Sequence, residues 1–131
     1  MEARNYLNEL KTRLATSTAI TVIEGVTEYE IRDSGYFRGR LSLSNGDFLE
    51  VSEYFIIRGG KPETVEYRYQ WMDNSKQRLI RRWDNARHFS ELPNFPHHVH
   101  VGDEKQVVPG QAMSILNLID LIEQQLEVKQ T

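Results

Sequence analysis

The sequence predicts an α+β domain: an antiparallel meander sheet of five to six strands with an N-terminal and a C-terminal helix packed on one face. Apolar residues recur at helical spacing only near the two ends of the chain. Between them lie alternating segments rich in Val, Ile, Thr and Tyr, as in half-buried strands. Short turn signals such as Asn45-Gly46 separate these segments, so neighbouring strands must run antiparallel.

The first helix is expected from Glu2 to about Ala15, because Leu7, Leu10 and Leu14 recur at spacings of three and four residues. The expected strands are Ala19–Arg32, Tyr36–Leu43, Phe48–Ile57, Thr64–Trp71, Leu79–Trp83 and, as a short sixth strand, His97–Val101. The segments 84–96 and 102–110 are expected to be loops.

The last helix is expected to begin between Gln111 and Ile115, with Ser114 as a candidate N-cap, and to run to about Val128. Leu118 and Leu121 widen its apolar stripe beyond what one sheet face requires. Two explanations remain open: a contact with a partner, such as a second copy in a homodimer, or deep burial between the sheet and a loop.

Composition indicates one soluble globular domain spanning residues 1–131. The chain has no cysteine, which excludes a disulfide scaffold, a thiol nucleophile and a thiolate zinc finger, and which fits the cytoplasm. The N-terminal residues do not read as a signal peptide, and no apolar run is long enough to span a bilayer.

The charge distribution points to an anion site at the centre of the chain. The net charge is −3, yet residues 58–88 hold eight Lys+Arg against four Asp+Glu. Strand alternation places a polar set on the sheet face away from the helices: Arg38, Arg40, Arg68, Gln70 and Arg82. These arginines are either phosphate contacts or ordinary solvated charges on a half-exposed sheet.

All four histidines lie within thirteen residues, at His88, His97, His98 and His100. In a strand, His98 and His100 point to one face and His97 to the other. A pair of imidazoles on one face suits general acid–base catalysis near neutral pH, or metal binding with His88 or Asp84 as a third ligand.

RNA cleavage by the 2′-hydroxyl needs an acid, a base and cations, and it needs no metal cofactor if arginine supplies the positive charge. Arg81, Arg82 and Arg87 adjoin the histidines in sequence, and Asp84 is placed to orient a histidine ring. Four aromatic residues are candidates for base stacking if they are exposed, although alternating aromatics more often form core: Tyr67, Tyr69, Trp71 and Trp83.

Several motifs together resemble the TumE-like toxin family of toxin–antitoxin modules. They are Tyr67-Arg68-Tyr69, Arg82-Trp83-Asp84-Asn85-Ala86, His88 and Pro96-His97-His98-Val99-His100. Arg87 and Phe89 stand where many relatives have a proline and a second histidine. The resemblance implies a toxin that acts in the cytoplasm and is held inactive by a helix-turn-helix antitoxin.

The first hypothesis is therefore a toxin that is a metal-independent ribonuclease. His98 and His100 serve as acid and base, His88 or His97 assists, and Asp84 orients a ring. Its phosphate-binding residues are Arg68, Arg81, Arg82 and Arg87. The alternatives are a non-catalytic module that binds nucleic acid or protein, and a metal-dependent hydrolase with histidine ligands.

Overall fold

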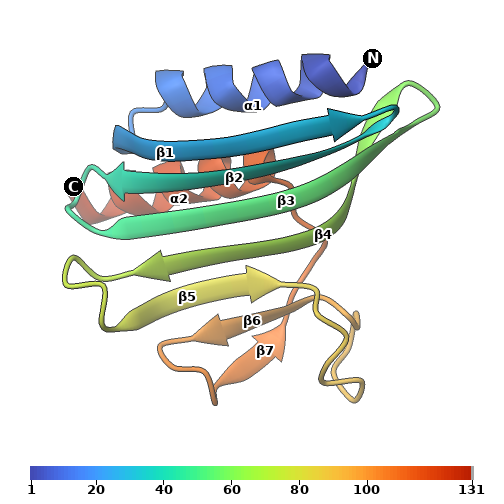
Figure 1. Cartoon of the computed structure of the whole chain (residues 1–131). Helices are drawn as coiled ribbons and strands as arrows, with labels where there is room; N and C mark the ends of the chain where they lie inside the picture. The colour runs from blue at the N-terminus through green and yellow to red at the C-terminus, as the bar shows by residue number, and fades with distance from the viewer. Residues whose placement is uncertain (131) are drawn as a thin grey trace.

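A computed structural model describes residues 1–130, without the side chains of 128–130, and has the predicted α+β architecture. The elements are α1 (Ala3–Thr16), β1 (Ile20–Ile31), β2 (Ser34–Leu43), β3 (Phe48–Arg58), β4 (Lys61–Met72), β5 (Leu79–Asp84), β6 (His98–Val101), β7 (Val107–Pro109) and α2 (Ile115–Gln130). The strands form one antiparallel sheet in chain order, from β1 to β7. Figure 1 shows this meander, with α2 crossing behind it and α1 lying along β1.

Tight turns produce the chain-order topology, because they leave no room for a crossover. Gly46 has φ +90° between β2 and β3. Gly59 and Gly60 have φ +59° and +75° between β3 and β4. Two successive residues with positive φ are what a two-residue hairpin turn needs to match the twist of its strands.

The sheet has seven strands, one more than the upper expectation of six. The additional strand is β7, which lies in the segment expected to be a loop and pairs with β6 through Val108↔Val99. Three residues ending in Pro109 carry too little alternation to be recognised as a strand. Pairing with β6 orders the segment, and this pairing is a tertiary contact.

The core lies between the helices and one face of the sheet. Tyr67, Tyr69, Trp71 and Trp83 belong to it, with exposed fractions of 6%, 0%, 1% and 4%. The suggestion that these rings stack bases is therefore wrong, because their faces are packed inside the protein.

Helix α2 begins where it was expected, since Asn117 N–H donates to Ser114 Oγ at 3.2 Å as in an N-cap. Leu118 is fully buried, and Leu121 is partly buried against the core. The wide apolar stripe is thus used within the chain and no longer argues for a homodimer. No helix among residues 1–130 is long and apolar enough to cross a membrane.

A buried carboxylate joins the two helices to the sheet. Glu53 on β3 has no exposed surface and accepts hydrogen bonds from Tyr6 Oη of α1 at 2.7 Å and from Ile115 N–H of α2 at 2.7 Å. Tyr69 Oη lies 3.3 Å from the same carboxylate and donates to Met113 O at 2.9 Å. Burial raises the pKa of Glu53.

Candidate functional site

The site is assembled by strand register on the open face, which we define as the sheet face opposite the helices. Two rows of directly paired residues cross β4, β5 and β6: Arg68–Asp84–His98 and Gln70–Arg82–His100. Side chains separated by two residues on a strand share a face, and paired residues on neighbouring strands are about 5 Å apart. Register alone therefore brings residues 84 and 98 together across 14 positions of sequence.

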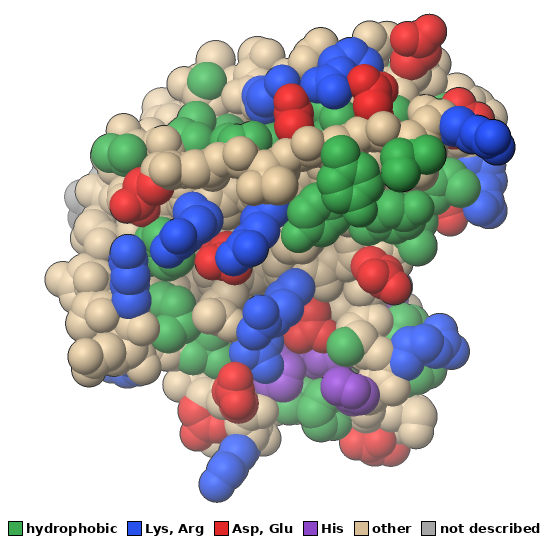
Figure 2. All heavy atoms as spheres, in the orientation of Figure 1, with side chains coloured by type: hydrophobic (Ala, Val, Ile, Leu, Met, Phe, Trp, Pro, Cys, Tyr) green, Lys and Arg blue, Asp and Glu red, His purple; other side chains and the backbone are tan. Residues whose placement is uncertain are grey.

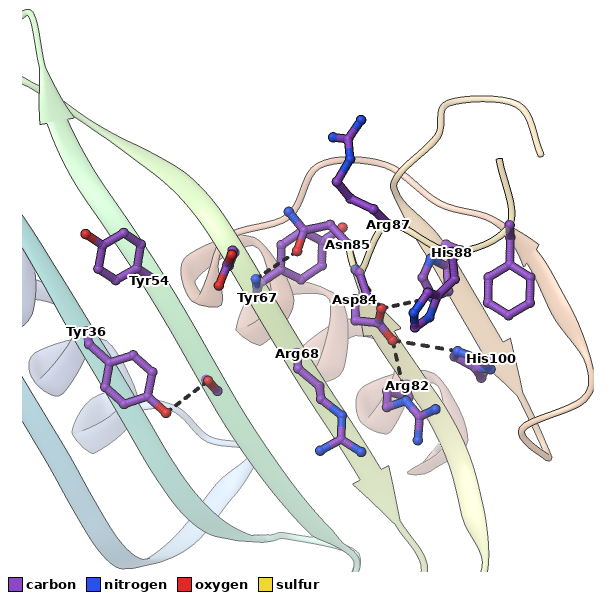
Figure 3. Close-up of a pocket in the computed structure, with 15 residues that line it drawn as sticks. Tyr36, Tyr54, Tyr67, Arg68, Arg82, Asp84, Asn85, Arg87, His88 and His100 are labelled. Carbon is purple, nitrogen blue, oxygen red and sulfur yellow. Dashed lines mark hydrogen bonds and ion pairs between the residues drawn. The ribbon is translucent and has the colours of Figure 1, made fainter. Parts of the chain in front are cut away.

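Asp84 is the centre of the cluster. Its Oδ1 lies 2.9 Å from His98 Nε2, and its Oδ2 lies 3.6 Å from His100 Nε2. Arg82 Nε is 3.5 Å from Oδ2. The Asp84, His98 and His100 side chains are 9%, 2% and 6% exposed, so a carboxylate and two imidazoles meet in a nearly dry place (Figure 3).

Both histidine rings are oriented by backbone carbonyls. His98 Nδ1 is 3.0 Å from Pro96 O, and His100 Nδ1 is 2.9 Å from Glu104 O. Since a carbonyl oxygen only accepts, we assign a proton to Nδ1 of each ring from these partners. The Nε2 atoms then face Asp84. Burial lowers the pKa of His100, which favours its neutral ring.

Arg82 borders the cluster on the other side. Its Nη1 donates to Glu104 Oε1 at 3.0 Å and to Gln70 Oε1 at 3.2 Å. Within residues 1–127, whose side chains are described, its buried Nε has no hydrogen-bond partner. The guanidinium thus places positive charge next to Asp84 without closing a hydrogen bond on it.

The cluster forms one wall of a cavity of about 500 Å³. Arg68, Arg87 and His88 line it with exposed side chains, while Tyr36 and Tyr54 border it from β2 and β3. Figure 2 shows this hollow, with Lys and Arg side chains in blue leading across the open face toward the histidines in purple. A cavity of this size with polar groups on one wall is typical of a small-ligand or substrate site.

The loop between β5 and β6 closes the site. Asn85 holds its start on β4, because its Nδ2 donates to Val65 O at 2.9 Å and its Oδ1 accepts from Tyr67 N–H at 3.0 Å. Phe89 places its ring edge-on to His98 and His100, with centroids 5.0 and 5.9 Å away. An apolar ring over two imidazoles keeps water from that side of the cluster.

Two residues of the predicted site lie elsewhere. His97 is on the helix side, where its Nδ1 is 2.9 Å from Tyr67 Oη and its ring stacks on that tyrosine. Arg81 also alternates to that side, and its guanidinium lies 5.9 Å from the centre of the Trp83 ring. Neither residue lines the cavity. Burial lowers the pKa of His97.

The sequence interpretation did not include Phe89, Tyr36 and Tyr54. For the two tyrosines a signal was available, since each alternates with a buried neighbour, Phe37 or Phe55, and must face the other way. No such periodicity exists for Phe89, whose position in an irregular loop has φ +62°.

Comparison with known proteins gave one family. A family model described as Toxin TumE matches residues 10–127 of the 131-residue chain. No curated protein and no solved structure matched the chain. The match covers every strand, half of α1 and most of α2, and it includes the whole cluster around Asp84.

Proposed function

The chain belongs to the TumE toxin family, and from this premise we propose that it is a toxin that cleaves RNA in the cavity beside Asp84. The main observation behind this proposal is that the side chains of Asp84, His98 and His100 meet at the wall of a cavity, and that arginines border the same cavity. Cleavage of a phosphodiester requires groups that transfer protons or hold a metal ion, and it requires cations that stabilise the charge on the phosphate.

Arginines are the proposed phosphate contacts. Arg68 and Arg87 line the cavity with exposed side chains, and Arg82 lies beside Asp84, with its Nε 3.5 Å from Oδ2. Arg87 also lies over the Phe95 ring, 5.1 Å from its centre, which holds the guanidinium at the cavity rim. A guanidinium fork matches the oxygens of a phosphate, so these residues suit a phosphodiester better than a neutral substrate.

Tyrosines of the open face are the proposed contacts for bases. Tyr29, Tyr36 and Tyr54 are cross-strand neighbours on β1, β2 and β3. The rings of Tyr29 and Tyr36 stack with their centroids 5.4 Å apart, and Tyr36 and Tyr54 border the cavity. Aromatic faces beside a basic groove favour single-stranded nucleic acid, since a duplex hides its base faces.

Two mechanisms use the same cluster. In the metal-independent one, a base takes the proton of the 2′-hydroxyl, its oxygen attacks phosphorus, and an acid protonates the departing 5′-oxygen. This leaves a cyclic phosphate and a 5′-hydroxyl. His98 and His100 serve that role only if their ring nitrogens reach the substrate, and both rings are almost fully buried with each Nδ1 on a carbonyl. This burial favours the second mechanism, in which Asp84, His98 and His100 hold a metal ion instead of exchanging protons with the substrate directly.

A toxin of this family implies an antitoxin as its partner. We propose that this antitoxin carries a helix-turn-helix domain and that the pair acts in the cytoplasm. Occupation of the cavity by the antitoxin, or distortion of the loop over it, would hold the toxin inactive.

The proposal is tested with the chain expressed alone in a bacterium and with purified chain incubated with single-stranded RNA. We expect growth arrest and cleaved RNA for the natural chain, and neither for His98→Ala combined with His100→Ala. Arg68→Ala should reduce RNA cleavage at least 10-fold, about the effect of one lost cation contact. Arg81→Ala, a matched change on the opposite face, should leave cleavage unchanged.

Growth arrest that survives the double histidine substitution would overturn the assignment of the cluster. RNA that is bound but never cut, at any length, would instead support the non-catalytic binding module. Equal effects of Arg68→Ala and Arg81→Ala would show that the cavity does not position the phosphate.

A further inference from the structure

The cluster around Asp84 has the donor set of a metal site. Among the described residues, Asp84, His98 and His100 form a group of three whose ligand atoms lie within 4.8 Å of one another. Around a tetrahedral zinc ion, with bonds of about 2.0–2.1 Å, neighbouring ligand atoms are about 3.3 Å apart. The carboxylate contacts the two Nε2 atoms through different oxygens, at 2.9 Å from Oδ1 and 3.6 Å from Oδ2, so both distances are near that value.

Hydrogen bonding leaves the electron pairs of the cluster facing inward. Each Nδ1–H is used by a backbone carbonyl, that of Pro96 or that of Glu104. Nε2 of His98 lies 2.9 Å from Asp84 Oδ1, and a nitrogen lone pair and a carboxylate oxygen do not approach so closely unless a positive charge joins them. That charge is either a proton on Nε2 or a metal ion that both groups bind.

The same pattern is the usual support of histidine ligands to metals. A ligating ring commonly donates its other N–H to a backbone carbonyl, which fixes the ring orientation and raises the basicity of the ligating nitrogen. Phe89 adds an apolar cover over both rings at 5.0 and 5.9 Å. The cluster therefore has ligands, carbonyl support and a dry side.

We propose that Asp84, His98 and His100 bind one divalent transition-metal ion, such as Zn²⁺, and leave its remaining coordination position open to the cavity. Two imidazoles and a carboxylate suit Zn²⁺, Fe²⁺ and related ions better than Mg²⁺ or Ca²⁺, which prefer oxygen ligands alone. Three protein ligands with an open position characterise catalytic rather than structural zinc sites.

The surrounding charges indicate what the open position takes. Arg82 lies 3.5 Å from Asp84 and is also paired with Glu104. Once a dication is bound, the two carboxylates offset only part of the combined positive charge of the metal ion and the guanidinium. The loaded centre is cationic and opens toward Arg68 and Arg87. An anionic phosphate oxygen or a water is the ligand that fits it. This role in RNA cleavage rests on the proposed function, whereas metal binding itself does not.

Metal binding is tested on the purified full-length chain after treatment with EDTA. Zn²⁺ is titrated in competition with a chromogenic chelator. We expect one Zn²⁺ per chain, affinity weakened at least about 100-fold in His100→Gln and in Asp84→Asn, and unchanged affinity in His97→Gln. His97→Gln is the matched control, because this ring is also partly buried but lies on the other face of the sheet.

A second measurement uses the natural chain alone, so it tests the site even if the substituted chains do not fold. X-ray absorption of the natural chain loaded with Zn²⁺ should show two imidazoles and a carboxylate in the first shell. Weak binding without defined stoichiometry, or a loss in His97→Gln equal to that in His100→Gln, would overturn the site. Zn²⁺ bound as expected with RNA left intact would keep the metal site and refute the proposed function. RNA cleaved at full rate by chain that binds no Zn²⁺ would refute the metal site alone.

Discussion

Replacement of Glu53 by leucine tests how the helices are held to the sheet. The change removes the acceptor of Tyr6 Oη and of Ile115 N–H, and both donors are in residues with no more than 1% exposure. A buried donor without a partner costs about 1–3 kcal/mol, so two donors cost about 2–6 kcal/mol. The desolvation of a buried carboxylate, which leucine avoids, offsets part of this.

We therefore expect Glu53→Leu to lower the free energy of unfolding by about 2–4 kcal/mol. For a domain of this size, that corresponds to a fall in Tm of roughly 6–20 °C. Glu53→Gln keeps one acceptor oxygen and should lose about 1–2 kcal/mol. Circular dichroism with thermal and urea unfolding measures both, and Glu63→Gln on the exposed part of β4 is the matched control.

The pH dependence provides a separate check on the same residue. Because burial raises the pKa of Glu53 above its ordinary value of 4.5, the folded chain keeps a proton that the unfolded chain has lost. Stability should fall as pH rises from about 4.5 through the raised pKa, and Glu53→Gln should remove that slope. A Glu53→Leu chain as stable as the natural one would refute the reasoning, since its donors would then have found other partners.

Two further predictions concern packing and the helix pair. Gly35→Ala should lower the free energy of unfolding by about 1–3 kcal/mol, because the added Cβ would lie 2.5 Å from Phe55 Cζ. Gly25→Ala is the control, since a Cβ there meets nothing within 4 Å and should be tolerated. Urea unfolding of both variants measures the difference. Arg13 pairs with Glu123 at 2.6 Å and lowers the pKa of that carboxyl, so this stabilisation is present above pH 4.5 and lost as pH falls. Arg13→Ala should therefore reduce stability at pH 7 by about 1 kcal/mol and by progressively less as pH falls below 4.5, and a loss independent of pH would contradict the pairing.

Local sequence patterns predicted most of the fold. Helical spacing of leucines located α1, and α2 begins at Ile115, within the expected range of 111–115 and directly after the candidate N-cap Ser114. Alternation and turn residues located five strands within a few positions and β6 almost to the residue. These patterns suffice because helix and strand periods, caps and turns act over a few neighbouring residues.

The errors occurred where long-range packing decides the outcome. β7 is a strand only because β6 lies beside it. Alternation separated Tyr67, Tyr69 and Trp71 from their polar neighbours correctly, and the aromatic rings lie on the face that the helices cover. Strand pairing decides the aromatic border of the cavity, which comes from Tyr36 on β2, Tyr54 on β3 and Tyr67 on β4.

The sequence by itself determined that His98 and His100 share a face, that His97 lies opposite, and that arginines precede them on the neighbouring strand. Each of these follows from a period of two within one segment. Tertiary structure decided that Asp84 pairs with His98 and that both rings are buried with Nδ1 on backbone carbonyls. The register between β5 and β6 is set across a loop of 13 residues, from 85 to 97, and no periodicity within either strand encodes it.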